Sequence, residues 1–222
     1  MTTIAQQSRA GRPTRAQAEA RIADLLDAAL DHFLDKGFEQ ATIDAIAASV
    51  SMTKRTVYAR FADKVTLFRA AVRRAIEAVV TTPDQLRAAE AATMEETLFN
   101  IATLRVAQVM TPAGLKLQRI INTEAYRFPD IFTLSYELGA LPVVNHIAAL
   151  LVRENAAGRL DVEEPYLAAN IFMSMVVSGP VRIIVSGNYL PRAEIERRVR
   201  YAVRIFLDGT RPRGPGPGDE AA

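Results

Sequence analysis

The chain has 222 residues, of which 50% are hydrophobic and 23% are charged. This balance is typical of a globular protein and excludes a disordered or fibrous chain. The sequence contains no cysteine, which excludes disulfides, thiolate metal sites and cysteine nucleophiles. The polar N-terminus lacks the apolar segment of a secretory signal. We therefore expect a soluble cytoplasmic protein with no membrane partner, no metal and no cofactor.

Positive charge is concentrated in the N-terminal third of the chain. The net charge of the whole chain is +2, whereas residues 1–74 hold 12 basic and eight acidic side chains. Two short segments, Ser8–Arg15 and Thr53–Phe61, are basic and contain no acid. Such segments are typical of proteins that bind polyanions, although a short basic run is by itself usually only a solvated surface.

The first predicted helix ends at Gly37. Apolar residues recur between Ile22 and Phe33 at the spacing of one helical face, with aspartates on the other faces. We expect Gly37 to adopt the left-handed conformation that stops a helix. Phe38 then folds back as the apolar contact of that cap.

Two short helices are predicted next. Thr42 is placed to cap a helix over Ile43–Val50, and Thr53 to cap another over Lys54–Arg60. Only two residues separate them before the second cap, so the helices must cross at a steep angle.

The spacing within this pair matches a helix-turn-helix. Counted from Ile43, Ala47, Ser51 and Val57 stand at the fifth, ninth and fifteenth positions. A helix-turn-helix needs a small residue, a turn residue and an apolar core residue there. The first turn of the second helix, Lys54–Thr56, would then point outward, and a basic helix of this kind can enter a major groove.

The stretch Arg21–Val72 resembles the DNA-binding domain of the TetR/AcrR family of bacterial transcriptional regulators. The most specific part of the resemblance is Thr42–Phe61, followed by Asp63-Lys64 and Leu67-Phe68. The resemblance implies an all-α fold, with an N-terminal three-helix helix-turn-helix domain and a larger C-terminal helical domain for ligand binding and dimerisation.

The expected organisation has four parts. Residues 1–20 form a flexible basic arm, and residues 21–74 form the DNA-binding domain with the start of a linking fourth helix. Residues 75–208 form the ligand-binding and dimerisation domain, and residues 209–222 form a disordered tail.

The resemblance also implies which side chains contact DNA. Lys54, Arg55 and Thr56 would read base edges, while Tyr58 and the residues at helix starts would contact phosphates. The full set of candidates is Thr42, Thr53, Lys54, Arg55, Thr56, Tyr58, Arg60 and Lys64.

Two residues depart from the family pattern. Ser51 stands where the family commonly has glycine, so a left-handed backbone there carries a steric cost. Arg55 replaces a second glycine, and its guanidinium either grips guanine or lies along the DNA backbone. The arm arginines, Arg9, Arg12 and Arg15, either enter the minor groove or belong to a solvated terminus.

The rest of the chain is predicted to be helical and to contain no strand. The predicted helices are Asp63–Val80, Met94–Met110, Ala113–Arg127, Asp130–Asn155, Glu164–Ser186 and Arg192–Leu207. Proline and glycine residues separate them. Pro142 and Pro180 lie inside two of these helices and are expected to kink or divide them.

The last two helices predict a homodimer. The middle of Glu164–Ser186 is apolar nearly all round, which requires burial on more than one side. We expect these helices to form a four-helix bundle with the same helices of a second copy. The alternative is that the domain covers both faces itself.

The resemblance implies a small-molecule effector, which the sequence does not identify. Candidate pocket residues are Phe99, Met110, Tyr126, Phe132, Tyr136, Met173 and Met175, with Asn145 and His146 as polar contacts. Aromatic and methionine side chains at helical spacing are more often ordinary core, and a lone histidine is more often structural.

Two functional hypotheses remain. The favoured one is a ligand-responsive DNA-binding regulator, expected to be a repressor that a small molecule releases from a palindromic operator. The other is an all-α small-molecule carrier or enzyme whose helix-turn-helix no longer binds DNA. The chain contains no GxGxxG, P-loop, HExxH or EF-hand pattern, which favours the regulator.

Overall fold

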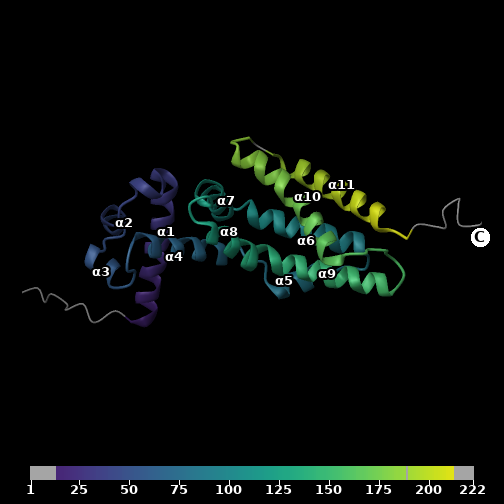
Figure 1. The fold of residues 1–222 in the computed structure, drawn as a ribbon, viewed down its shortest axis with the longest axis horizontal. Helices are drawn as coiled ribbons and strands as arrows, with labels where there is room; N and C mark the ends of the chain where they lie inside the picture. The colour runs from purple at the N-terminus through teal and green to yellow at the C-terminus, as the bar shows by residue number, and fades with distance from the viewer. Residues whose placement is uncertain (1–13, 189, 213–222) are drawn as a thin grey trace, which may run out of the picture. The chain divides into compact units, whose positions relative to one another are not determined.

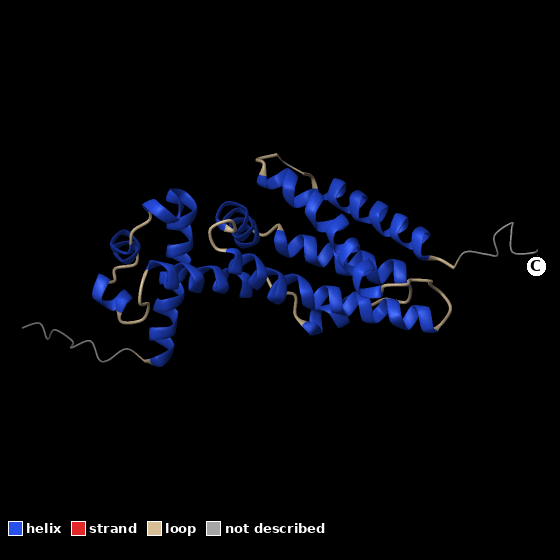
Figure 2. Cartoon of the chain, in the orientation of Figure 1, coloured by secondary structure: helices blue, strands red, loops and turns tan. Residues whose placement is uncertain are grey.

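The structure is a computed structural model that describes residues 14–188 and 190–212. In those residues every regular element is helical, as Figure 2 shows. The chain divides after Ala71 into two compact units. The predicted all-α fold, with a small N-terminal helical unit and a larger C-terminal one, is confirmed.

The N-terminal unit is built around three phenylalanines. It contains α1 (Arg15–Gln40), α2 (Ile43–Ser49), α3 (Lys54–Tyr58) and the first half of α4 (Lys64–Glu77). The rings of Phe33 and Phe38 stack with centroids 5.7 Å apart, and Phe68 meets both rings edge-on at 5.0 and 5.3 Å. Phe38 therefore folds back onto Phe33 as expected, and Phe68 fixes the first half of α4 against both rings.

The limits of α1 differ from the prediction at both ends. It begins at Arg15, because Thr14 and Gln17 form a capping box, so the C-terminal part of the expected arm is helical. Gly37 has the expected positive φ of 74°, but its ψ of 163° is extended rather than left-handed helical. The helical backbone is therefore interrupted at Gly37 as predicted, and one further turn to Gln40 follows beyond the kink. The arm residues Arg9 and Arg12, and residues 213–222 of the expected tail, lie outside the described residues.

The C-terminal unit is a bundle in which α6, α9, α10 and α11 supply most of the core (Figure 1). Its helices are α5 (Pro83–Ala89), α6 (Met94–Val109), α7 (Pro112–Glu124), α8 (Pro129–Ser135), the π-turn η1 (Tyr136–Ala140), α9 (Leu141–Ala156), α10 (Pro165–Val185) and α11 (Arg192–Thr210). α10 packs along α9 and also contacts α6, α7 and α11. The rings of Phe172 and Phe206, 5.0 Å apart, join α10 to α11.

Two prolines explain where this unit departs from the predicted elements. Pro83 follows the cap residue Thr82 and starts α5, a short helix that the sequence pattern did not predict. Pro142 has no backbone N–H, and the helix predicted over Asp130–Asn155 is divided before it into α8, η1 and α9. By contrast, α10 runs through Pro180 as one element.

Two apolar stretches, Pro129–Ala156 and Pro165–Ile184, are long enough to cross a bilayer by length and composition alone. Core helices of globular proteins meet the same criterion. Here α9 and α10 pack against each other and α10 packs against α6, and 33% of each stretch is buried within the chain.

Candidate functional site

The helix-turn-helix is formed by α2, α3 and the residues between them. Ala47 is fully buried at the crossing, and its carbonyl accepts a hydrogen bond of 2.8 Å from the Met52 amide. Ser51 has a φ of 52°, the left-handed conformation that was expected at a steric cost. The close crossing therefore depends on a small residue at position 47 and on backbone strain at Ser51.

α3 has one buried face and one exposed face. Val57 is fully buried, whereas the Lys54–Thr56 turn is exposed. Tyr58 is 45% exposed. The Thr53 hydroxyl accepts a hydrogen bond from the Thr56 amide at 3.1 Å, so it caps the helix as predicted. Sequence pattern alone thus placed the outward side chains correctly.

Charges on this surface are partly compensated within the protein. Lys54 Nζ lies 2.9 Å from Asp44 Oδ2, and this hydrogen bond, with the charge of Asp44, raises the pKa of Lys54 above its usual 10.5. The same ammonium lies 5.9 Å from the centre of the Tyr58 ring. Arg55 and Arg60 are exposed, and in residues 14–188 and 190–212 neither has an acidic partner. They remain free to meet an anion.

Lys64 has a different environment from the one expected. Its Nζ donates to the carbonyl oxygens of Phe38, Glu39 and Ala41 at 2.8, 3.0 and 3.1 Å. The ammonium also lies 4.6 Å from the centre of the Phe38 ring. An ammonium has three N–H donors, and all three are used on the end of α1. Lys64 therefore positions α4 against α1, and its expected phosphate contact is corrected.

Comparisons with known proteins match both units. The family described as "AefR-like transcriptional repressor, C-terminal domain" matches residues 96–209. The family described as "Bacterial regulatory proteins, tetR family" matches residues 25–71. The first match alone covers more than half of the chain. The chain belongs to the TetR family. It is accordingly a DNA-binding transcriptional regulator, and its relatives are regulators rather than enzymes.

Solved structures of TetR-family proteins resemble this one over most of their length. A TetR-family transcriptional regulator from Mesorhizobium loti MAFF303099 is 28% identical, with a TM-score of 0.72, and the match covers 90% of this chain and 100% of that one. The "Flavonoid-responsive Regulator FrrA" is 29% identical, with a TM-score of 0.69 and 88% and 100% coverage. A TetR-family regulator from Pseudomonas syringae pv. tomato, 23% identical, shares the fold with a TM-score of 0.65 and 88% and 98% coverage. No protein in the curated set matches the chain.

The C-terminal unit of this TetR-family chain contains a cavity of about 240 Å³ among α6–α10, which we call the Arg105 cavity. It is lined by Arg105, Val109, Gln118, Ile121, Phe132, Ser135, Tyr136, Ala140, Val144, Asn170, Met173, Ser174, Val177 and Ser178. Three of the predicted pocket residues, Phe132, Tyr136 and Met173, are among them. The Tyr136 hydroxyl accepts a 2.7 Å hydrogen bond from Asn170 and lies 2.8 Å from the Tyr166 hydroxyl.

The other predicted pocket residues do not line this cavity. Tyr126 is 98% exposed, and Asn145 and Met175 also face solvent, so they correct the prediction. Met110 packs against the core cluster. The central carbon of the Arg200 guanidinium lies 3.9 Å from the centre of the Phe99 ring. Phe99 lines a different surface hollow.

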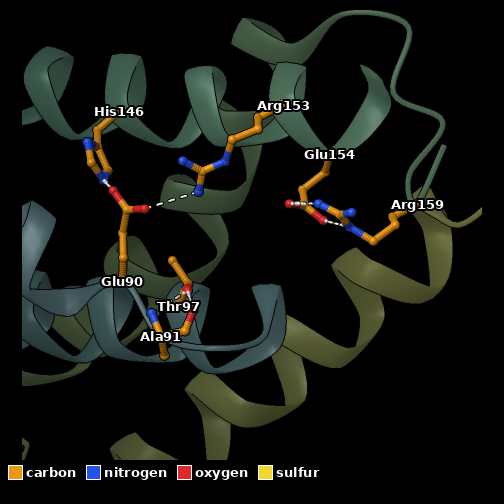
Figure 3. Close-up of polar contacts among 7 residues, drawn as sticks. All are labelled: Glu90, Ala91, Thr97, His146, Arg153, Glu154 and Arg159. Carbon is orange, nitrogen blue, oxygen red and sulfur yellow. Dashed lines mark hydrogen bonds and ion pairs between the residues drawn. The ribbon is translucent and has the colours of Figure 1, made fainter. Parts of the chain in front are cut away.

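His146 belongs to a polar cluster that Figure 3 shows. Its Nε2 lies 3.3 Å from Glu90 Oε1, an ion-pair distance without the alignment of a hydrogen bond. The other Glu90 oxygen accepts a 3.0 Å hydrogen bond from Arg153 (Figure 3). His146 therefore lies beside the residue that follows α5 and does not line the Arg105 cavity.

A second hollow, of about 520 Å³, lies beside that cluster. Its three arginines already have carboxylate partners: Arg153 pairs with Glu90, Arg159 with Glu154 at 2.6 and 2.8 Å, and Arg211 with Asp208. The bond from Arg159 lowers the pKa of the Glu154 carboxyl. The three arginines of this hollow are therefore already neutralised by carboxylates of the chain.

Sequence reasoning missed Arg105 itself. It shares a helical stripe with Ile101 and Val109, four residues away on either side, and both are buried. That spacing was the available signal, because a charged residue on a buried stripe must face the inside of the unit. Across residues 14–188 and 190–212, no three metal-ligating side chains gather at one place.

Proposed function

We propose that this TetR-family chain is a ligand-responsive, sequence-specific repressor that acts as a homodimer on a palindromic operator in the cytoplasm. Lys54, Arg55 and Thr56 face base edges in the major groove. Thr42, Thr53, Tyr58 and Arg60 contact the phosphate backbone around them. Lys64 holds the unit together and makes no contact with DNA.

One observation carries the DNA-reading part of the proposal. The exposed Lys54–Thr56 turn stands on a helix whose opposite face is fixed in the core by Val57. A side chain can read a base edge only if its helix is held in a defined orientation. Arg55 within this turn and Arg60 just after α3 have no acidic partner in the described residues. They add positive charge, which the phosphate backbone of DNA attracts.

An apolar surface on the last two helices supports the dimer. The large apolar side chains exposed on α10 and α11 are Tyr166, Leu167, Ile171, Met175, Tyr201 and Ile205. Exposed large apolar side chains that gather on one surface are typical of protein interfaces. In a two-fold dimer the same helices of each copy meet, which gives the four-helix bundle expected from the sequence.

Ligand response and repression are supported by the relatives and by the Arg105 cavity. One matching family is described as a transcriptional repressor, and FrrA is described as flavonoid-responsive. In the dimer, two α3 helices would enter successive major grooves about 34 Å apart. A ligand that favours a different spacing misaligns one half-site, and it shifts the equilibrium only by its difference in affinity for the two states.

The experiment measures binding of the full chain to DNA from the region upstream of its gene, as a function of salt. We expect tight binding to an inverted repeat. The slope of log affinity against log salt should become shallower by about 0.9 for each phosphate that a variant no longer neutralises. Lys54→Ala and Tyr58→Phe should each weaken binding. Lys36→Ala, on an exposed lysine of α1, is the control and should not.

Unchanged affinity and unchanged salt slope in both Lys54→Ala and Tyr58→Phe would contradict the assigned DNA surface. Equal weakening in the Lys36→Ala control would do the same, because it would show that binding reports only total charge.

A further inference from the structure

Among the residues that the structure describes, Arg105 is the only charged one that lines the Arg105 cavity. The residue is only 8% exposed. Its Nη1 donates a 3.0 Å hydrogen bond to the Val79 carbonyl, and in the described part of the chain it has neither another hydrogen bond nor a carboxylate partner. A guanidinium has five N–H donors. Four of them are therefore left without a protein acceptor at the edge of a cavity.

A buried cation without an anion is unfavourable. Burial lowers the pKa of Arg105, and no neighbouring charge opposes that effect. Paired buried charges are tolerated, whereas an unpaired one carries most of its desolvation cost. An anion that entered the cavity would relieve that cost, so the structure has a built-in preference for a negatively charged occupant.

A glycine in η1 leaves space for the Arg105 guanidinium. A Cβ atom on Gly139 would lie 3.3 Å from Arg105 Nη2, closer than most side-chain contacts. Glycine at this position therefore leaves Nη2 room beside the π-turn. The same turn carries Tyr136, so one element supplies both the space for the cation and an aromatic wall of the cavity.

The remainder of the cavity is suited to an apolar body of limited size. Val109, Ile121, Val144 and Met173 form its buried apolar wall. Its volume of about 240 Å³ is below the roughly 300–1,000 Å³ of common ligand pockets, which favours a compact molecule. A highly charged, fully polar ion such as phosphate would leave this wall uncovered.

We propose that the Arg105 cavity binds a compact organic carboxylate, whose anionic group pairs with Arg105 and whose apolar body lies against Val109, Ile121 and Val144. A carboxylate matches the fork of a guanidinium and can accept two parallel hydrogen bonds from it. This inference rests on the proposed function, because it names the chemical class of the small molecule that releases the regulator.

The hydrogen bond to Val79 connects the ligand charge to α4. Val79 lies two residues beyond the end of α4, the helix within which the chain passes from one unit to the other. A carboxylate can pair with the free N–H groups, and if it draws the guanidinium toward itself, the hydrogen bond from Nη1 to the Val79 carbonyl lengthens or breaks. Binding would thereby change how the segment after α4 is held.

The test uses the full chain and three carboxylates, benzoate, cinnamate and octanoate, each compared with its neutral amide. Ligand binding to the folded state raises the melting temperature. We expect at least one carboxylate at millimolar concentration to raise it by several degrees while its amide does not. Arg105→Met should weaken that carboxylate by at least about tenfold, since a buried charge pair is removed, and Arg105→Lys should retain part of the affinity.

A carboxylate effect that survives in Arg105→Met, an amide that binds as well as its acid, or no response to any of the three carboxylates would each overturn the proposal. The comparison of acid with amide needs only the unmodified chain, so it remains decisive if Arg105→Met does not fold. Operator binding is measured in parallel without ligand. Loss of operator binding contradicts the proposed function alone, whereas intact operator binding with no carboxylate effect contradicts only this inference.

Discussion

Lys54 Nζ and Asp44 Oδ2 lie 2.9 Å apart, so the first lysine of α3 is paired with an acid of α2 when no DNA is bound. Both side chains are more than half exposed. An exposed pair of this kind adds little to stability. Its consequence is functional, because Lys54 must leave Asp44 before it can face a base or a phosphate.

Asp44→Asn should therefore strengthen operator binding. Removing an exposed ion-pair partner is worth roughly twofold to fivefold in affinity, because Lys54 no longer has to be released. Fluorescence anisotropy with labelled operator measures the change. Asp35→Asn on α1 carries the same charge change and is the control. If Asp44→Asn still strengthens binding in a Lys54→Ala background, the effect is general electrostatics and not release of Lys54.

Lys64→Met should destabilise the chain without changing the salt slope of DNA binding. Three charge-assisted hydrogen bonds to the end of α1 would be removed, at a cost of about 1–3 kcal/mol in the free energy of unfolding. Thermal unfolding followed by circular dichroism measures this, with Lys36→Met as the control. A normal melting temperature with a smaller salt slope would instead restore Lys64 to the phosphate-binding set.

The sequence predicted the helix-turn-helix well because that motif is local. Thr42, Thr53 and Val57 act through neighbours a few residues away, so their spacing carries the geometry. Lys64 was misread because its partners lie 23 to 26 residues earlier in the chain. The Arg105 cavity could not be predicted from the sequence for the same reason. Six elements meet around it, and no periodic pattern shows which of their side chains converge.

Ile171→Lys and Ile205→Lys should each convert the proposed dimer to a monomer. In the proposed interface both side chains become buried, and an unpaired buried charge in each copy should weaken association by at least about 100-fold. Sedimentation equilibrium measures the dissociation constant. Val152→Lys is the control, because Val152 is equally exposed but lies on α9. A dimer that persists in both interface variants would place the contact elsewhere.

Gly114→Ala should be strongly destabilising although it adds only a methyl group. A Cβ atom there would lie 2.6 Å from the Gln108 carbonyl oxygen and closer still to that of Val109, and neither backbone group can move freely. Overpacking of this kind costs about 1–3 kcal/mol. Gly209→Ala, where a Cβ atom meets nothing within 4 Å in the helix α11, should instead be neutral or slightly stabilising. Equal melting temperatures for the two variants would contradict the tight α6–α7 connection.

The change of stability with pH between 4.5 and 2 should depend on Glu194 at the start of α11. Its carboxylate accepts hydrogen bonds from Arg197 at 2.7 and 2.8 Å and from Arg198 at 2.8 Å, which lower its pKa from 4.5 to about 2. Because the pKa is lower in the folded state, the contribution is complete above pH 4.5 and is lost as the pH falls toward 2. Glu194→Gln should therefore melt earlier than the unmodified chain at neutral pH, and the difference should disappear by about pH 2. The double variant Arg197→Gln with Arg198→Gln should show the same convergence, because it removes the groups that shift the carboxyl. A difference in melting temperature that stays constant from neutral pH down to pH 2 would show that these arginines do not hold the charged form of Glu194.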